Sequence, residues 1–510
     1  MFRSTASDRS FIIGAELLQI SPSRCAALLL STALLQASAA AAADPARVAE
    51  AAKARDREAV RRLVAQHVDV NAPLADGATA LHWAAQWEEV DTAALLIRAG
   101  ANVNAADDDG VTPLVLAAQN GNAPIVDALL AAGANPNLAL PAGETPLMIA
   151  ARSGKPDVVK ALVARGAEVD AKEKTLGQTA LMWAAADRHA DVVRLLIESG
   201  ADVRARSNAG FTPLLFAARE GDRPVTTELI ARGADVNGAS GDGMTALLTA
   251  LIRHHLDYAR FLIDRGADPD KGAGYTPLHW AAGEWSGELS VSVAADSEWA
   301  AFGGLTGPER LEMVKLLLAH GADPNARVTR NVRRYGGAGG NAGSLVGATP
   351  FLLAAMAADL DVMRVLMQAG ADPKATTDSK TTALMLAAGL AHSPGVTPIS
   401  DASALAAVKL TLELGNDVHA ANAAGETALH AAAYWGATAV AAFLIERGAD
   451  VNAKNRKSWT PLVITEGIYQ GGGLKYFPST AEVLRRSGSE ASPANVDRAN
   501  GGFIRDQPVR

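Results

Sequence analysis

Histidines are the first side chains to consider for chemistry in this chain. His82, His279 and His430 could each serve as a general base or a metal ligand, and each lies three residues after a threonine. His254 and His255 are adjacent, but neighbours on a helix point about 100° apart and do not easily share one metal ion. The Gly-x-Ser-x-Gly and His-Glu-x-x-His patterns are both missing. We therefore expect a protein that is not an enzyme, with no catalytic residue, no metal site and no cofactor.

Composition and charge narrow the class of partner. The chain has 510 residues and a net charge of −8, with 49% hydrophobic but only 5% aromatic residues. A mildly acidic protein of this size has no general attraction to nucleic acids or anionic membranes. The single cysteine, Cys25, lies near the N-terminus, so disulfides and cysteine metal sites are excluded from the rest. These features give no support for a nucleic acid or an anionic membrane as the partner.

Residues 1–39 have the pattern of a secretory signal peptide. Arginines precede an apolar run from Cys25 to Leu35, and Ala37-Ser38-Ala39 offers a cleavage site. This run is too short for a bilayer, which needs about twenty residues, and no later segment is long enough. We therefore predict a periplasmic or secreted protein without a membrane span in the mature chain. The alanine-rich composition with such a signal indicates a bacterial source. A plain alanine-rich tail is the alternative.

A Thr-Pro/Ala-Leu triplet, once Thr-Pro-Phe, recurs along the chain. It begins at Thr79, Thr112, Thr145, Thr179, Thr212, Thr245, Thr276, Thr349, Thr382, Thr427 and Thr460, and most intervals are 33 residues. Threonine predicts a helix N-cap, and proline after it fits the first helical position. A second apolar-periodic helix then ends at a glycine such as Gly100, and a hairpin with a tip such as Asp107–Gly110 follows. Each period therefore predicts two helices and a short hairpin.

Gly-Ala-Asp/Asn segments alternate with these triplets, for example Gly100-Ala-Asn-Val-Asn104 and Gly448-Ala-Asp-Val-Asn452. Together the two patterns resemble the ankyrin-repeat family over roughly residues 46 to 487. The resemblance implies an all-α repeat solenoid of about twelve units, each a helix-turn-helix with a short β-hairpin. It also implies a structural hydrogen bond for each histidine that follows a triplet, and protein binding as the general activity.

Departures from the period divide the chain further. Residues 46–78 lack the triplet, and His67 stands where a helix-ending glycine is expected, which is typical of a capping repeat. Residues 79–275 are predicted to form regular repeats, and residues 276–487 to form repeats with long insertions. Residues 488–510 are polar and without a period, and we expect a disordered tail.

The insertions mark the expected binding surface. Those at 283–307, 389–401 and 467–478 fall between the two helices of alternate repeats, and a fourth at 326–347 falls in a hairpin. Such loops map to one face of a solenoid, often the binding face. The expected partner-binding residues are Trp87, Trp285, Trp299, Phe302, Arg330, Arg333, Arg334, Tyr335, Tyr434, Trp435, Tyr469, Tyr476 and Phe477. The alternatives are loops that only cover the helices, a solvated charged loop around the arginines, and simple packing of Trp87, Tyr434 and Trp435.

The predicted function is an exported scaffold that binds a protein partner through its concave face and its C-terminal insertion loops. Two alternatives share the same fold. One is an accessory subunit that stabilises or assembles a periplasmic enzyme, and the other is an effector exported to a host cell. We expect a monomer in the absence of a partner.

Overall fold

The computed structural model describes residues 46–283, 305, 307–330, 344–390, 399–470, 473–490, 496–497 and 502–503. Within these residues the chain forms twelve helix pairs, which confirms the predicted all-α solenoid. The first helices of the pairs are α2 (Arg47–Lys53), α4 (Ala80–Gln86), α6 (Pro113–Asn120), α8 (Pro146–Arg152), α10 (Ala180–Ala186), α12 (Pro213–Glu220), α14 (Ala246–Ile252), α16 (Pro277–Ala282), α18 (Pro350–Met356), α20 (Ala383–Ala387), α22 (Ala428–Trp435) and α24 (Pro461–Thr465). The second helices are α3 (Arg57–Ala65), α5 (Val90–Arg98), α7 (Ala123–Ala131), α9 (Pro156–Ala164), α11 (Ala190–Glu198), α13 (Arg223–Ala231), α15 (Leu256–Asp264), α17 (Gly307–Ala319), α19 (Leu360–Gln368), α21 (Asp401–Glu413), α23 (Thr438–Glu446) and α25 (Pro478–Arg486).

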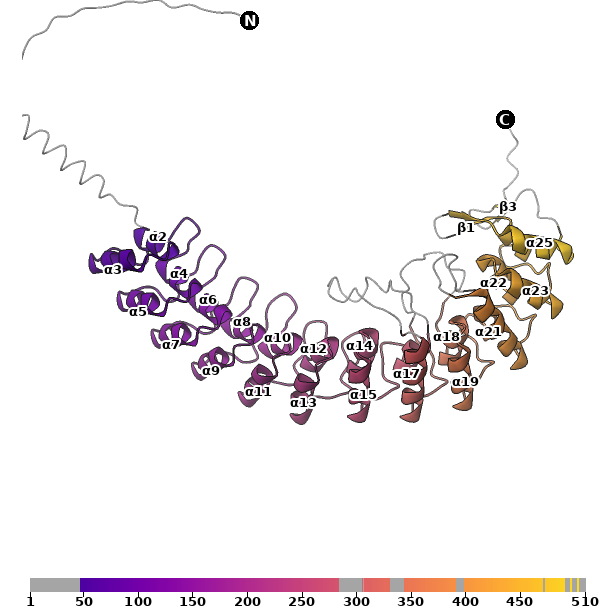
Figure 1. Ribbon diagram of the computed structural model, residues 1–510, viewed down its shortest axis with the longest axis horizontal. Helices are drawn as coiled ribbons and strands as arrows, with labels where there is room; N and C mark the ends of the chain where they lie inside the picture. The colour runs from indigo at the N-terminus through magenta and orange to yellow at the C-terminus, as the bar shows by residue number, and fades with distance from the viewer. Residues whose placement is uncertain are drawn as a thin grey trace, which may run out of the picture. The chain divides into compact units, whose positions relative to one another are not determined.

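The helices belong to two compact units. Unit 1 contains the chain up to Ala117 together with Asp127–Ala134, and unit 2 contains Ala118–Val126 and the chain from Asn135 onward. Within unit 1, α2 packs on α4 and α3 on α5. Within unit 2, α8, α10 and α12 pack in series, and α9, α11 and α13 form a parallel series beside them (Figure 1). Each unit is therefore two layers of helices, here called inner (even-numbered) and outer (odd-numbered).

Toward the C-terminus the even-numbered helices remain the inner ones and the odd-numbered helices the outer ones, beginning with α16 and α17.

Threonine side chains cap the N-termini of inner helices. Thr145 Oγ1 accepts a hydrogen bond from the Met148 amide at 3.3 Å, and Thr460 Oγ1 accepts one from the Val463 amide at 3.4 Å. Both helices have proline at the start, where a missing N–H costs nothing. Threonine N-caps therefore begin the inner helices that follow a triplet, as predicted, whereas α2 begins after Ala46.

Small and left-handed residues close each repeat. Ala217 and Ala218 on α12 are fully buried, which lets neighbouring inner helices approach closely. Gly100, which follows α5, has a φ of 87°, a conformation that costs roughly 1–2 kcal/mol for residues with a β-carbon. His67 has a φ of 57° at the same place in the first repeat, so a residue with a β-carbon takes the left-handed conformation there.

The hairpin loops differ in detail from the prediction. Among the described residues they are turns without paired strands, although the fold class is as predicted. The loop at Asp107 is closed by a bond from its amide to the Val111 carbonyl at 3.0 Å. Its tip bonds to the preceding loop, because the Asp108 amide donates to the Asp76 carbonyl at 3.0 Å. The backbone groups of this loop are thus satisfied partly within the loop and partly by the loop of the neighbouring repeat.

The insertions change the lengths of the helices around them. Inner helices α20 and α24 have five residues each, whereas α18 between insertions has seven. Outer helices α17 and α21 have thirteen residues instead of the usual nine. The inner helix therefore ends early where an insertion follows, and the outer helix starts early after two of them.

Strands occur only near the C-terminus of the described chain. Strands β1 (Ile468–Gln470) and β2 (Gly473–Lys475) pair antiparallel within the last insertion. Strands β3 (Val496–Asp497) and β4 (Gly502–Phe503) also pair, inside the segment that we expected to be disordered. Val496 and Phe503, which pair across these two strands, are β-branched and aromatic residues that favour strands.

Candidate partner-binding surface

Two tryptophans and two cations gather at the ends of α2 and α4 in unit 1. Trp83 lies on α4 and Trp87 directly follows it, with ring centroids 6.0 Å apart and 26° between the planes. Lys53 Nζ lies 5.0 Å from the centroid of Trp83, and the Arg55 guanidinium lies 5.5 Å from that of Trp87. The ring of Trp87 is held by these contacts while the residue stays 36% exposed. Such cation–π contacts contribute roughly 0.5–1 kcal/mol at exposed sites.

A buried carboxylate fixes the cation beside Trp87. Glu89 has a side chain that is only 3% exposed, and its Oε1 lies 3.0 Å from Arg57 Nε and 3.7 Å from Arg55 Nε. Thr92 Oγ1 donates to the other carboxylate oxygen at 2.9 Å. Sequence reasoning named Trp87 but missed Lys53 and Arg55, because they belong to the preceding repeat. Lys53 and Arg55 lie at the end of the first inner helix, as Trp87 does in the next repeat, and this shared position could have indicated the contact.

Tyr434 does not belong to an exposed surface, contrary to the prediction. It is 1% exposed, and its hydroxyl donates to Glu426 Oε1 at 3.0 Å. Asn455 Nδ2, from the loop of the next repeat, donates to the same oxygen at 2.9 Å. Burial raises the pKa of Glu426 to about 7, against the lowering effect of these two hydrogen bonds and of Lys457. The residue therefore joins two repeats instead of facing a partner.

Three other predicted aromatic residues lie against glycines of the C-terminal repeats. Trp435 is half-buried, and a β-carbon on Gly389 would lie 3.0 Å from its ring. Phe477 covers Gly436 so closely that no β-carbon would fit there. Tyr476 packs beside Gly467 and is 57% exposed. Phe477 and Trp435 thus mainly cover the array, whereas Tyr476 offers its ring to solvent.

Arg330, the first of the predicted partner-binding arginines, has a structural role. Arg330 Nη2 donates to the carbonyls of Asp242 and Ala273, both at 2.9 Å, and so ties its loop to the two preceding loops. The other predicted residues of this insertion, Arg333, Arg334 and Tyr335, lie outside the described residues. The same holds for Trp285, Trp299 and Phe302 and for the side chain of Tyr469.

The histidines of the triplets have a structural role. The Thr276 amide donates to His279 Nδ1 at 3.0 Å, so His279 Nε2 carries the proton and donates to the Ala348 carbonyl at 3.1 Å. Burial lowers the pKa of His279 to about 4, and that of His430 also to about 4. Both rings are neutral and have both nitrogens engaged near pH 7. Within the described part of the chain, no three His, Cys, Asp or Glu residues lie close enough to hold a metal ion.

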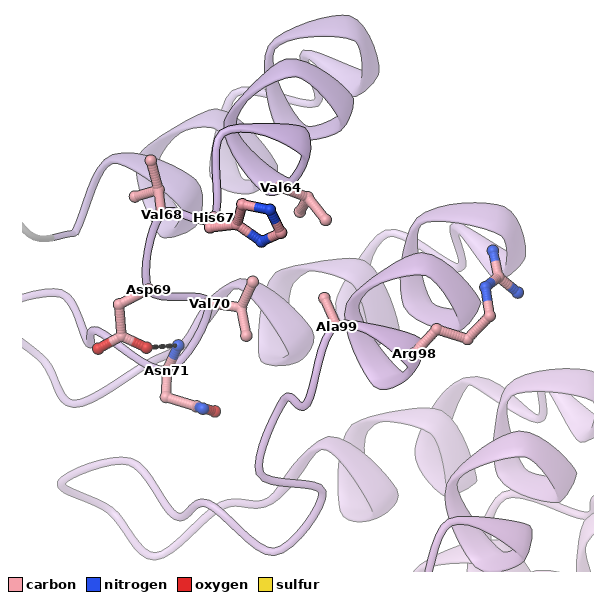
Figure 2. Close-up of a pocket in the computed structure, with 8 residues that line it drawn as sticks. All are labelled: Val64, His67, Val68, Asp69, Val70, Asn71, Arg98 and Ala99. Atoms are coloured by element: carbon pink, nitrogen blue, oxygen red, sulfur yellow. Dashed lines mark hydrogen bonds between the residues drawn. The ribbon is translucent and has the colours of Figure 1, made fainter.

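A shallow hollow of about 470 Å³ lies beside the ends of α3 and α5 in unit 1 (Figure 2). Asp69 Oδ1 accepts the Asn71 amide at 2.9 Å, and Asn71 Nδ2 donates to the Gly100 carbonyl at 3.1 Å. Figure 2 shows the Arg98 side chain pointing away from His67. The polar groups do not converge on one point as a small-molecule site requires.

Known protein families account for most of the described fold. The family profile of ankyrin repeats in three copies matches residues 48–139, 116–207, 147–240 and 214–291. The single ankyrin-repeat profile matches residues 299–328, 346–378 and 424–456. These segments cover more than half of the chain. The chain belongs to the ankyrin-repeat family.

The crystal structure of the human ASB11 ankyrin repeat domain is similar to this ankyrin-repeat protein. The two share 30% sequence identity with a TM-score of 0.40, over 44% of this chain and 98% of that domain. Ankyrin repeats are generally protein-binding scaffolds and typically non-catalytic. In the described part of this ankyrin-repeat protein, none of the helices has the length and apolar character needed to cross a membrane.

Proposed function

We propose that this ankyrin-repeat protein is exported from the cytoplasm and binds a protein partner through its concave face and its C-terminal insertion loops. The observation that carries the binding surface is the exposed edge of Trp87, stacked on Trp83 and held by Arg55. Tryptophan is enriched at the centres of protein interfaces. A ring that is already fixed loses little conformational entropy on binding. Trp87 is therefore the anchor that we assign to unit 1.

Tyr476 is the matching candidate in unit 2. It lies in the last insertion, between β2 and α25, and more than half of it is exposed. A tyrosine combines a large apolar ring with a hydroxyl that can bond a partner, which suits a protein interface. The described part of the C-terminal loops thus supports a split role, with Phe477 covering the helices and Tyr476 available for contact.

Affinity purification from the periplasmic fraction, with partners identified by mass spectrometry, tests this surface. Trp87→Ala and Tyr476→Ala are compared with Leu176→Ala, which removes an apolar side chain of intermediate exposure (41%, against 36% for Trp87 and 57% for Tyr476) from a hairpin loop of unit 2. We expect each of the first two variants to weaken partner binding about tenfold or more, which corresponds to about 1.4 kcal/mol. Leu176→Ala should bind as the wild type does. Unchanged binding by both Trp87→Ala and Tyr476→Ala would reject the proposed surface.

The identity of the captured protein separates the alternative functions. One enzyme captured in a fixed ratio would favour the accessory subunit, and it would lose stability in cells that lack the ankyrin-repeat protein. Detection of the protein inside host cells would favour an exported effector. Several unrelated partners, all lost with Trp87→Ala, would support the general scaffold.

Export has a separate test because it rests on residues 1–39. We expect the mature protein in the periplasm or medium to begin near Ala40, and its N-terminal sequence measures this directly. An intact Met1 on the protein in the cytoplasmic fraction would reject export. That outcome would leave the binding surface untouched, since Trp87 lies outside the signal.

A loop deletion tests the C-terminal insertions. Leu305 is 2% exposed, and its carbonyl accepts a bond from the buried Arg310 Nη2 at 3.0 Å. The deletion should therefore remove 284–304, replace it with a short glycine linker and retain Leu305. Removing a surface loop costs little, so we expect a folded helical array with weaker partner binding. Wild-type affinity would exclude this loop from the interface.

A further inference from the structure

Glu426, Tyr434 and Asn455 form a buried polar cluster that the proposed binding surface does not use. Glu426 is 5% exposed and precedes α22, Tyr434 lies near the end of that helix, and Asn455 belongs to the loop of the last repeat. The Tyr434 hydroxyl and Asn455 Nδ2 both donate to Glu426 Oε1, at 3.0 and 2.9 Å. Among the described residues, Glu426 Oε2 has no hydrogen-bond partner. The carboxyl group thus connects two consecutive repeats through one oxygen only.

This arrangement suits a neutral acid better than a carboxylate. An ionised carboxyl group needs partners for both oxygens, and burial of an uncompensated charge costs more than burial of a hydroxyl without an acceptor. No described cation lies within ion-pair distance of Glu426. In the neutral form Oε1 is the carbonyl oxygen, and it still accepts the two hydrogen bonds from Tyr434 and Asn455.

The loop that Asn455 controls is tightly organised around it. Asn455 Oδ1 accepts the amides of Lys457 and Trp459, at 2.9 and 3.0 Å. The Asn455 amide itself donates to the Trp459 carbonyl at 3.0 Å. Asn455 is 5% exposed, and the hydrogen bond from its Nδ2 to Glu426 connects that carboxyl group to the loop 453–460.

We propose that Glu426 is a proton-controlled latch of the last repeat. As the neutral acid it holds the loop 453–460 against α22, and the loss of its proton weakens that hold. The latch is a property of the fold and goes beyond the proposed function, since it requires no partner. The loop directly precedes α24, and Tyr476 packs beside Gly467, which lies two residues after that helix.

Other titratable groups face the cluster and set its pH dependence. Lys457, from the last loop, lowers the pKa of Glu426, while burial raises it to about 7. The Tyr434 hydroxyl has its pKa raised well above the ordinary value by burial and by Glu426, so it keeps its proton. His430 on α22 bonds to the Trp459 carbonyl at 3.1 Å, and burial lowers its pKa to about 4. His430 therefore favours opening as the pH falls, which is opposite in sign to Glu426.

A comparison of two proteins that both contain His430 removes the contribution of this histidine to the pH dependence. Amide hydrogen exchange of Trp459 and its loop neighbours, corrected for intrinsic rates, is measured from pH 4.5 to 8 in the wild type and in Glu426→Gln. Gln keeps the accepting oxygen but cannot ionise. We expect the opening constant of the wild type, divided by that of Glu426→Gln, to rise up to tenfold per pH unit between about 4.5 and 7, and then to level off.

A matched control and a direct titration complete the experiment. Glu144 holds the same position before Thr145 but is only half-buried, and Glu144→Gln should leave the pH dependence of the last loop unchanged. Carbon NMR of the wild-type protein should show the Glu426 carboxyl titrating near pH 7. A midpoint near 4.5, or a ratio that does not change with pH, would overturn the latch.

Discussion

The Asn325 side chain joins its repeat to Gly370 in the next one through both ends of its amide. Asn325 Nδ2 donates to the Gly370 carbonyl at 2.9 Å, and its Oδ1 accepts the Asp372 amide at 2.8 Å. Asn137 makes the same pair of bonds to Gly166 and Glu168, at 2.9 and 2.8 Å. The clamp satisfies a carbonyl at the end of an outer helix, where no intrahelical donor exists. It needs one donor and one acceptor, so asparagine fits and aspartate does not.

Asp270 occupies the clamp position in another repeat and provides the first prediction. Its two oxygens accept the Asp323 amide at 2.9 and 3.1 Å, but a carboxylate has no donor for the Gly321 carbonyl. Burial raises the pKa of Asp270, against the lowering effect of the hydrogen bond from the Asp323 amide. We expect Asp270→Asn to stabilise the array by about 1 kcal/mol, and Asn325→Asp to destabilise it by about 1–3 kcal/mol.

Urea unfolding followed by circular dichroism gives the free energy of unfolding of both variants. The comparison requires that the slope of this free energy against urea concentration is the same in each protein. Opposite shifts of the midpoints are the expected result. Two shifts of the same sign would contradict the clamp as the reason for asparagine at this position.

The contact between Gly436 and Phe477 provides a second prediction. Gly436 and Gly448 have φ of 77° and 91°, so alanine is strained at both positions. A β-carbon meets the Phe477 ring at Gly436, whereas nothing lies within 4 Å of it at Gly448. We expect Gly448→Ala to cost about 1–2 kcal/mol, and Gly436→Ala to cost at least about 1 kcal/mol more because of overpacking. Equal thermal stability of the two variants would mean that Phe477 moves aside freely.

Left-handed residues at the turns between inner and outer helices provide a third prediction. Ala358 has a φ of 52° at the turn between α18 and α19, where several other repeats have glycine. Its neighbour Ala357 has the ordinary helical φ of −76°. Ala358→Gly relieves strain and should stabilise unit 2 by up to about 1 kcal/mol. Ala357→Gly should destabilise it by about 0.5–1 kcal/mol. Thermal unfolding of the pair distinguishes them, and destabilisation by both would contradict the strain at Ala358.

Acid should weaken the array through its buried histidines. The pKa values of His279 and His430 are lowered to about 4, so each contributes stability that is fully present above pH 6.5 and is lost as the pH falls toward 4. Each contributes up to about 1.4 kcal/mol per pH unit in that window. Glu426 opposes this trend between pH 7 and 4.5, since its pKa is raised.

Unfolding free energies from pH 4 to 7.5 test the histidines. We expect His279→Gln to be less stable near pH 7 and to lose less stability on acidification than the wild type. The exposed His419 serves as the control, and His419→Gln should follow the wild-type curve. A His279→Gln protein with the wild-type slope would show that this histidine is not linked to unfolding.

Much of the local structure is readable from the sequence because its causes are local. A threonine followed by proline specifies the start of a helix within four residues, as at Thr145. A glycine specifies the left-handed turn that ends the outer helix, as at Gly100. The 33-residue interval then implies that each pair of helices must be covered by the next pair. The repeat family follows from these local rules, and the structural role of His279 follows from the resemblance to that family.

The surface depends on contacts between residues that are far apart along the chain. Tyr434 and Trp435 are neighbours, yet one is buried against Glu426 and Asn455 and the other is half-exposed over Gly389. Trp87 is fixed by Arg55 of the preceding repeat, and Arg330 is held by carbonyls of two preceding loops. A one-dimensional pattern gives the type and place of each side chain. Whether that side chain meets a partner is decided by what the adjacent repeat puts against it, and only the tertiary structure decides that.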